Sequence, residues 1–257
     1  MRFSGGRSVE IHDHKKKEAY VHTLFSNIAH RYDLLNTVLS FNRDKHWRRF
    51  AVARCELKPG GYGLDVCCGT GMFALEQAKV VGRRGRVIGV DFCEEMMARG
   101  RQNIARTPYK DVVEFVWGNA MDLPFQDDTF DCATIGFALR NVPDIKRTIQ
   151  EMMRVVRPGG KVVSLELAKP SLPLFKQLYY LYFNHLVPLL GRLGVGLVGP
   201  YSYLPNSLKS FPHQKEIRDL FENVGLKDAR YYELTGGIVA VHVGTKPVKG
   251  STFYVEA

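Results

Sequence analysis

The chain has 257 residues, of which 45% are apolar and 24% are charged, as in an ordinary globular protein. This composition excludes a disordered chain, a collagen-like repeat and a small disulfide-stabilised fold. Lysine and arginine outnumber aspartate and glutamate by 36 to 26, and the net charge of +10 suits either a polyanionic partner or simple solubility. The length predicts a single domain over residues 1–257.

The N-terminal part of the chain is expected to be helical. Its first residues are polar and lack the apolar core of an export signal. The chain has five cysteines without a paired spacing, so we expect reduced thiols in a cytoplasmic protein. Residues 15–55 are predicted to form a helical cover over the rest of the fold. One apolar helical stripe is predicted there, because apolar residues recur at spacings of four and three: Tyr20, Leu24, Ile28, Tyr32 and Leu35.

From residue 61 the pattern changes to short apolar runs that alternate with helical segments. Strands are predicted at 61–66, 85–91, 112–118, 130–137 and 161–168, and helices at 73–80, 94–105 and 145–156. The last of these helices is expected to stop at Arg157-Pro-Gly-Gly. Such alternation predicts a parallel, doubly wound α/β sheet of the Rossmann-like kind.

The alternation ends after residue 170. Residues 171–205 are rich in Leu, Tyr and Phe and are expected to form an apolar helical insert after strand five. Lys176 and two prolines interrupt this stretch, which argues against a membrane span. A helix at 213–224 precedes two β-rich runs, at 227–234 and 237–245, which are predicted to pair as an antiparallel hairpin. The hairpin brings the sheet to seven strands, and 247–257 is expected to be a loose tail.

The strongest local signal is Leu64-Asp-Val-Cys-Cys-Gly-Thr-Gly71, which joins the first predicted strand to its helix. Ligands bind at the carboxyl ends of strands in open α/β sheets, and Gly69 and Gly71 allow a tight turn and close approach of a ligand. The glycines also satisfy the dinucleotide pattern, with Asp91 placed 20 residues past Gly71. The loop alone therefore does not distinguish NAD from another adenosine ligand, and an NAD-dependent oxidoreductase remains an alternative.

Charge favours S-adenosylmethionine over NAD. The carboxylate of Asp65, at the end of the first strand, would repel a pyrophosphate and attract the ammonium and sulfonium groups of S-adenosylmethionine. Asp91 can accept hydrogen bonds from both ribose hydroxyls, although a helix N-cap is the alternative role. Asn119 and Ala120 follow the third strand and can meet an adenine edge, although Asn119 also suits a turn.

Several segments of the chain resemble those of a known family. The glycine loop, Asn119-Ala-Met-Asp-Leu-Pro-Phe and Arg154-Val-Val-Arg-Pro-Gly-Gly resemble class I S-adenosylmethionine-dependent methyltransferases. Longer segments narrow the resemblance to the ubiquinone/menaquinone biosynthesis C-methyltransferases over about residues 17–246. They are Arg31-Tyr-Asp-Leu-Leu-Asn-Thr-Val-Leu-Ser-Phe, Gly136-Phe-Ala-Leu-Arg-Asn-Val-Pro-Asp, Leu165-Glu-Leu-Ala-Lys-Pro and Tyr231-Tyr-Glu-Leu-Thr-Gly-Gly-Ile-Val-Ala-Val-His.

The resemblance implies contacts to S-adenosylmethionine at Thr70, Asp91, Asn119 and Ala120. It also implies methyl transfer to a ring carbon of a prenylated quinol. Residues 17–50 and Gly136 are more similar to the menaquinone members, which favours demethylmenaquinol, while a ubiquinone-pathway benzoquinol is the alternative. No metal-ligand cluster is visible in the sequence, and methyl transfer to an activated ring carbon needs none.

Three residues are candidates on the acceptor side. Arg140 follows the fourth strand and could stabilise a developing phenolate, or form a surface salt bridge instead. Asn141 could bind a quinol oxygen or belong to a helix-start turn. Tyr32, in the N-terminal cover, could contact quinol or cofactor, or merely pack. The adjacent Cys67 and Cys68 are interpreted as small residues of a tight turn and not as nucleophiles.

A prenylated substrate implies contact with a membrane. We expect the insert and the N-terminal helices to form an apolar mouth, with Lys176, Arg192 and Lys209 near anionic headgroups. A buried core or a homodimer surface is the alternative for these apolar residues. Nucleic-acid binding finds no support beyond net charge, because no reader motif or basic-aromatic stripe is present.

Overall fold

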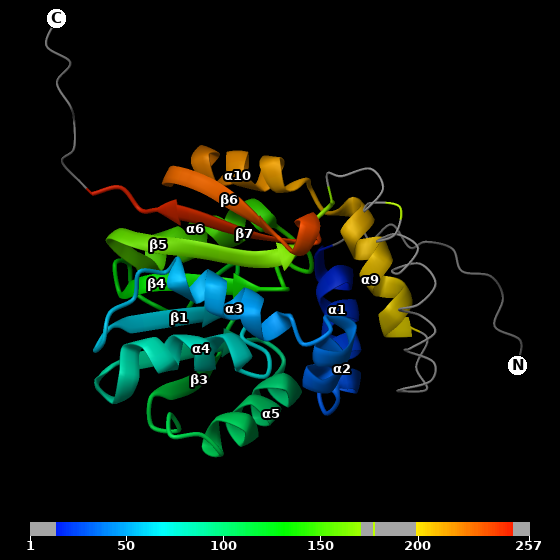
Figure 1. The fold of residues 1–257 in the computed structure, drawn as a ribbon, viewed down its shortest axis with the longest axis horizontal. Helices are drawn as coiled ribbons and strands as arrows, with labels where there is room; N and C mark the ends of the chain where they lie inside the picture. Colours follow the sequence, from blue (N-terminus) through cyan, green and yellow to red (C-terminus); the bar gives the residue numbers. More distant parts are fainter. Residues whose placement is uncertain (1–13, 171–176, 178–198, 249–257) are drawn as a thin grey trace, which may run out of the picture.

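The central sheet of the protein has helices on both of its faces (Figure 1). The computed structural model describes residues 14–170, 177 and 199–248. Their strands are β1 (Tyr62–Val66), β2 (Arg86–Asp91), β3 (Val113–Trp117), β4 (Phe130–Gly136), β5 (Val156–Leu167), β6 (Lys227–Leu234) and β7 (Val239–Thr245). They form one sheet of order β3-β2-β1-β4-β5-β7-β6.

The pairing confirms the predicted doubly wound sheet with its C-terminal hairpin. Strands β1 to β5 pair in parallel, and β7 pairs antiparallel with both β5 and β6. The order reverses between β1 and β4, which are neighbours although two strands separate them in the chain. This switch point is where open α/β sheets form ligand crevices at the carboxyl ends of their strands.

Each face of the sheet is covered by its own group of helices. The helices α3 (Asp44–Ala53), α4 (Met72–Val81) and α5 (Glu94–Ala105) lie on one face, and α6 (Ile145–Val155) and α10 (Gln214–Asn223) lie on the other (Figure 1). The central strands are buried on both sides, so they read as continuous apolar runs. The short helices η1 (Gly82–Arg84) and η3 (Thr235–Gly237) complete the connections around them.

The N-terminal cover differs from its prediction. The single stripe is divided between α1 (His14–Ile28) and α2 (Tyr32–Leu39), because the chain turns at residues 29–31. Leu24 and Ile28 are buried as expected, but Tyr20 is 41% exposed. The turn brings α2 back over the glycine loop, where it makes polar contacts that a straight helix could not reach. Both helices lie at the carboxyl ends of the parallel strands, as does α9 (Gly199–Ser210) (Figure 1).

The fifth strand begins earlier than predicted. Residue 156 already pairs with Phe130, and an irregularity in the ladder follows before regular pairing of Cys132 with Lys161. The Arg157-Pro-Gly-Gly segment therefore lies within β5 and does not precede it. Of the predicted insert, residues 171–176 and 178–198 lie outside the described residues, as does 249–257 of the tail. None of the described helices is long and apolar enough to cross a bilayer.

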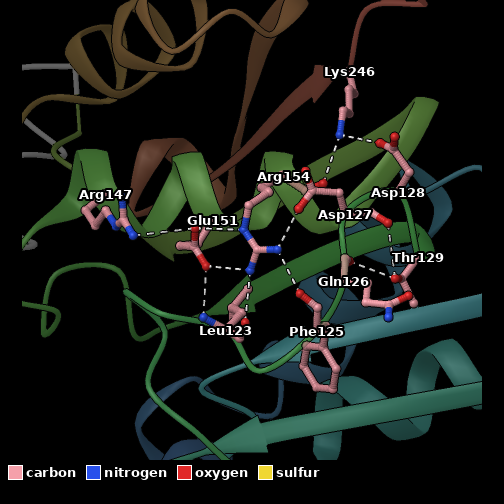
Figure 2. Close-up of polar contacts among 10 residues, drawn as sticks. All are labelled: Leu123, Phe125, Gln126, Asp127, Asp128, Thr129, Arg147, Glu151, Arg154 and Lys246. Carbon is pink, nitrogen blue, oxygen red and sulfur yellow. Dashed lines mark hydrogen bonds and ion pairs between the residues drawn. The ribbon is translucent and has the colours of Figure 1, made fainter.

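A polar cluster around Arg154 holds the loop between β3 and β4 against α6 (Figure 2). The guanidinium donates to the carbonyl oxygens of Leu123 and Phe125 at 2.9 and 2.7 Å. It also pairs with Glu151 and Asp127, and Glu151 accepts from the backbone N–H of Leu123 at 2.9 Å. The bond to Glu151 is the main cause that raises the pKa of Arg154. This cluster fixes the end of the loop that begins at residue 118.

Candidate active site

A cavity of about 310 Å³ opens at the carboxyl ends of β1 to β4, beneath α1, α2 and α3. Its volume is at the lower end of the range for small-molecule sites. Eight of the ten predicted site residues line it: Tyr32, Asp65, Gly69, Thr70, Asp91, Asn119, Ala120 and Asn141. Gly71, in the same loop as Gly69 and Thr70, does not line it, and neither does Arg140.

The loop after β1 is held in a conformation that requires its glycines. Gly69 and Gly71 have φ angles of +51° and +76°, and Cys67 adopts +53°, which is uncommon for a residue with a side chain. A Cβ atom at Gly71 would lie 2.7 Å from the ring of Phe115. The second glycine is therefore needed both for its backbone angle and for close packing beneath the cavity.

The carboxylate of Asp65 is directed at the start of α4. One oxygen accepts from the backbone N–H of Ala74 at 3.0 Å, and the other accepts from the hydroxyl of Thr134 at 2.8 Å. Burial raises its pKa to about 7, although these two bonds oppose the shift. The side chain thus joins β1, β4 and α4, and it also borders the cavity. Its carboxyl is far less acidic than the sequence argument assumed.

Asp91 organises the turns on either side of it. Its carboxylate accepts from the backbone N–H of Gly69 at 2.8 Å and from that of Cys93 at 2.9 Å. Burial raises the pKa of this carboxyl, while the backbone bonds oppose the rise. A carboxylate offers about four lone-pair positions, so acceptor capacity remains toward the cavity. Asp91 thus holds the glycine loop and, through Cys93, the turn that leads into α5.

The segment after β3 places an amide and a small side chain at the cavity. Asn119 is exposed, and its side-chain oxygen accepts from the backbone N–H of Met121 at 2.9 Å, as a turn residue would. Ala120 is buried beside it. Trp117 is 66% exposed at the rim, with its indole N–H donating to the carbonyl of Phe92 at 3.1 Å.

Arg140 is buried against Glu166 on β5. One guanidinium nitrogen pairs with the Glu166 carboxylate and donates to the carbonyl of Phe137 at 2.7 Å. The two side chains are only 6% and 1% exposed, so this is a buried ion pair and not the surface salt bridge named as the alternative. Burial is the largest single influence and lowers the pKa of Arg140, but the charge and hydrogen bond of Glu166, together with the Tyr32 and Tyr203 phenols, oppose it and leave the pKa raised. Arg140 therefore lies behind the cavity wall.

Asn141 and Tyr32 both line the cavity. The side-chain oxygen of Asn141 accepts from the hydroxyl of Tyr203 on α9 at 2.9 Å. Tyr32 packs edge-on against Phe25, with ring centroids 5.8 Å apart. Burial raises the pKa of its phenol, so Tyr32 is neutral and is a hydrogen-bond donor at neutral pH. Both residues are positioned to contact a polar group of a bound acceptor.

Arg48 on α3 lines the cavity, and the sequence analysis missed it. Its guanidinium pairs with Asp44 at 2.5 Å and lies 5.8 Å from the ring centroid of Phe137. Both partners are buried. The spacing of four residues between Asp44 and Arg48 was visible in the sequence. Such pairs usually lie on helix surfaces, so the spacing alone gave no reason to place a cation at the site.

The cysteines are placed as expected for packing residues. Cys67 and Cys68 lie in the tight turn, and burial raises the pKa of both thiols well above the usual value, which makes them poor nucleophiles at neutral pH. The fold also brings together His22, Cys93 and Glu95, whose ligand atoms all lie within 4.8 Å of one another. This group was not predictable from the sequence, because His22 comes from α1, Cys93 from the turn after β2 and Glu95 from the first turn of α5.

Solved structures show which class of protein has this fold. The structure of a SAM-dependent methyltransferase from Aquifex aeolicus matches with a TM-score of 0.58 and 18% identity, covering 77% of this chain and 89% of that one. A possible histamine N-methyltransferase from Thermotoga maritima matches with a TM-score of 0.60 and 22% identity, covering 87% and 98%. The fold is that of the S-adenosylmethionine-dependent methyltransferases.

Sequence relatives narrow the class to a family. The ubiE/COQ5 methyltransferase family matches residues 13–246, and the chain belongs to this family. A protein named demethylmenaquinone methyltransferase from Desulfitobacterium hafniense (strain Y51) is 49% identical over 91% of this chain and 92% of its own length. One of the same name from Shouchella clausii (strain KSM-K16) is 44% identical over 91% and 99%. The resemblance predicted from the motifs is confirmed, and the NAD-dependent alternative is set aside.

Proposed function

We propose that the protein transfers the methyl group of S-adenosylmethionine to a ring carbon of demethylmenaquinol, giving menaquinol. The observation that carries this proposal is the 44–49% identity to proteins named demethylmenaquinone methyltransferase over 91% of the chain. The cavity supports it, because carboxylate and amide groups gather at one end and Tyr32, Phe137 and Asn141 lie at the other.

The donor end fits an adenosyl ligand with a cationic centre. Asp91 would accept from the ribose hydroxyls, and Asn119 and Ala120 would lie against the adenine. Gly69, Thr70 and Gly71 would let the backbone approach the ligand closely. Asp65, at the floor, would become ionised when a positive charge lies beside it, since an opposite charge stabilises the carboxylate.

The residues at the acceptor end would position the quinol and stabilise its negative charge. The quinol ring carbon attacks the methyl carbon, the carbon–sulfur bond breaks with its electron pair going to sulfur, and the ring carbon then loses its proton to solvent. Ionising the neighbouring hydroxyl makes that carbon nucleophilic, and the Arg48 guanidinium would stabilise the phenolate. Tyr32 and Asn141 would hold the quinol oxygens, which fixes the ring for in-line attack. No metal is required, because the sulfonium already activates the methyl group.

Arg140 is assigned a positioning role in this scheme. Its bonds to Glu166 and to the carbonyl of Phe137 hold the turn after β4, where Phe137 has a φ of +56°. That turn carries Asn141. We infer that Arg140 acts through Asn141 and the backbone, and not by touching the quinol. We also infer that the enzyme works at the cytoplasmic side of a membrane, since the prenylated quinol resides in the bilayer.

The decisive experiment incubates the protein with methyl-labelled S-adenosylmethionine and chemically reduced demethylmenaquinone, with the ubiquinone-pathway benzoquinol in a parallel reaction. Label is expected in the naphthoquinone product, identified by mass spectrometry, and not when the reductant is omitted. Label in the benzoquinol alone would move the assignment to the other quinone. Labelling of neither quinol, with S-adenosylmethionine bound, would refute the proposed acceptor.

A further inference from the structure

The outward face of α2 carries an unusual concentration of apolar side chains. The helix has no buried residue. Tyr32 lines the cavity, whereas Leu34 and Val38, one helical turn apart on the other side, are 64% and 48% exposed. Phe41, in the turn that follows, is 74% exposed and has a φ of +50°. Three of the seven large apolar side chains that are exposed in the described parts of the chain therefore lie within eight positions.

Within residues 31–55, every exposed charged side chain is basic. Arg43, Lys45 and Arg49 are exposed between the end of α2 and the end of α3. The segment from 31 to 55 contains two acidic residues, and both are engaged inward. Asp33 accepts from Thr70 and Asn103, and Asp44 is buried against Arg48. An anionic surface would thus meet basic side chains without a compensating carboxylate.

We propose that this α2 surface, made of Leu34, Val38, Phe41, Arg43 and Lys45, docks on an anionic phospholipid bilayer. Apolar side chains that project between cations match the boundary between acyl chains and charged headgroups. A protein partner would require a larger apolar area than three side chains provide. With few apolar groups the contact is reversible and depends on both the insertion and the charge.

The α2 surface lies on a helix that also borders the cavity, and the role in substrate entry that we assign to it rests on the proposed function. The helix that would touch the bilayer presents Tyr32 to the cavity on its other side. A prenylated quinol would therefore move from the membrane into the site past one helix, with its tail remaining among the acyl chains. The transfer would not need the substrate to cross water, where its tail is insoluble.

Vesicle flotation tests the surface with matched variants. Wild-type protein is expected to float with vesicles of phosphatidylcholine and phosphatidylglycerol in equal amounts, but not with phosphatidylcholine alone. The pair Val38→Ser and Phe41→Ser should weaken binding at least about tenfold. Arg43→Glu with Lys45→Glu should weaken it by about fivefold per residue or more. The controls are Val80→Ser and Arg83→Glu with Arg84→Glu. These exposed apolar and basic residues lie between the end of α4 and the start of β2, at the opposite end of the strands from the cavity, and their replacement should leave binding unchanged.

Turnover separates this inference from the proposed function. All four sets of variants should methylate a short-tailed, water-soluble naphthoquinol at the wild-type rate, while only the α2 variants should be slow on long-tailed quinol supplied in vesicles. Equal flotation of wild type and α2 variants would overturn the docking surface even if the enzyme is active. A change of oligomeric state in the Val38→Ser, Phe41→Ser protein without vesicles would overturn it too, in favour of a second copy of the chain. Inactivity of the wild type on both quinols would refute the function and leave the flotation result standing.

Discussion

The hydroxyl of Thr70, in the glycine loop, donates a 2.6 Å hydrogen bond to the carboxylate of Asp33 on α2. The other oxygen of Asp33 accepts from the side-chain amide of Asn103 on α5 at 2.8 Å. The N-terminal cover is thus fastened directly to the loop that forms the floor of the cavity. The position of the cover and the shape of the glycine loop therefore depend on the same contact.

Replacing Asp33 should loosen this fastening. Asp33→Ala removes both acceptors and leaves Thr70 and Asn103 without their partner, so S-adenosylmethionine should bind about tenfold more weakly, equivalent to about 1.4 kcal/mol. Hydrogen exchange of α2 should rise in the same variant, because the helix has few other polar ties. Asp33→Asn keeps one oxygen for Thr70 and should lose less affinity. Equal losses in the two variants would contradict this account. Calorimetric titration provides the affinities.

The raised pKa of Asp65 should appear in the pH dependence of donor binding. With a pKa of about 7 in the free protein, the carboxyl is ionised above that pH and neutral below it. A cationic ligand prefers the ionised form, so its affinity should fall by up to about tenfold for each unit of pH below 7. Asp65→Asn should bind weakly with a flat profile. Asp111→Asn, at an exposed position, should retain the wild-type profile, and a flat wild-type profile would contradict the assignment.

Truncating Arg140 should destabilise the fold as well as slow the reaction. Arg140→Ala leaves the buried Glu166 carboxylate without its cation, which typically costs about 3–5 kcal/mol of unfolding free energy. Adding Glu166→Gln should recover much of that stability. If Arg140 acts only by positioning, the double variant should regain turnover along with stability. A stable double variant that has no activity but binds S-adenosylmethionine normally would instead support direct contact of Arg140 with the quinol. Urea unfolding and initial rates measure the two effects.

His242 should make the fold sensitive to acid. It lies buried on β7, where its Nε2 bonds the carbonyl of Gln214 at 2.9 Å and its Nδ1 bonds Ser164 at 3.1 Å. A carbonyl only accepts, so Nε2 carries the proton and the ring is neutral. Burial lowers its pKa from 6.5 to about 4. The unfolded chain therefore binds the proton first, and stability is complete above pH 6.5 and falls by about 3 kcal/mol as the pH drops to 4.

The measurement for this prediction is denaturant unfolding across that pH interval. His242→Gln removes the titrating ring and should flatten the curve, at the cost of lower stability at neutral pH. His46→Gln, at an exposed position on α3, should leave the slope unchanged. A steep curve that persists in His242→Gln would assign the acid sensitivity to other groups.

Local patterns were sufficient to predict the sheet and to bring most of the proposed donor-side residues to one cavity. The apolar runs and the glycine loop mark the strand ends, and parallel strands necessarily bring those ends to one edge, so Asp65, Asp91 and Asn119 meet there. Contacts between distant segments were not predictable in this way. The pairing of Arg140 with Glu166 depends on β4 and β5 being neighbours in the sheet. The turn between α1 and α2 goes with contacts that Asp33 on α2 makes with Thr70 and Asn103, which are distant in the sequence.

Arg48 shows why the acceptor side is harder to predict. Nothing in its own neighbourhood separates it from the exposed basic residues beside it, because only the packing of α3 on the sheet decides which face is buried. The raised pKa of Asp65 was not predictable for a similar reason. Its sequence position indicates a carboxylate at the site, but its ionisation depends on burial and on Thr134, which is 69 positions away.

The cavity lies at the switch in strand order, and different parts of the chain form its two ends. The proposed donor pocket is made by the turns that follow the strands of the sheet, while the proposed acceptor end is covered by helices that precede β1. The helices that precede β1 could therefore change in evolution and accept a different aromatic substrate, while the turns that would bind the methyl donor stay the same.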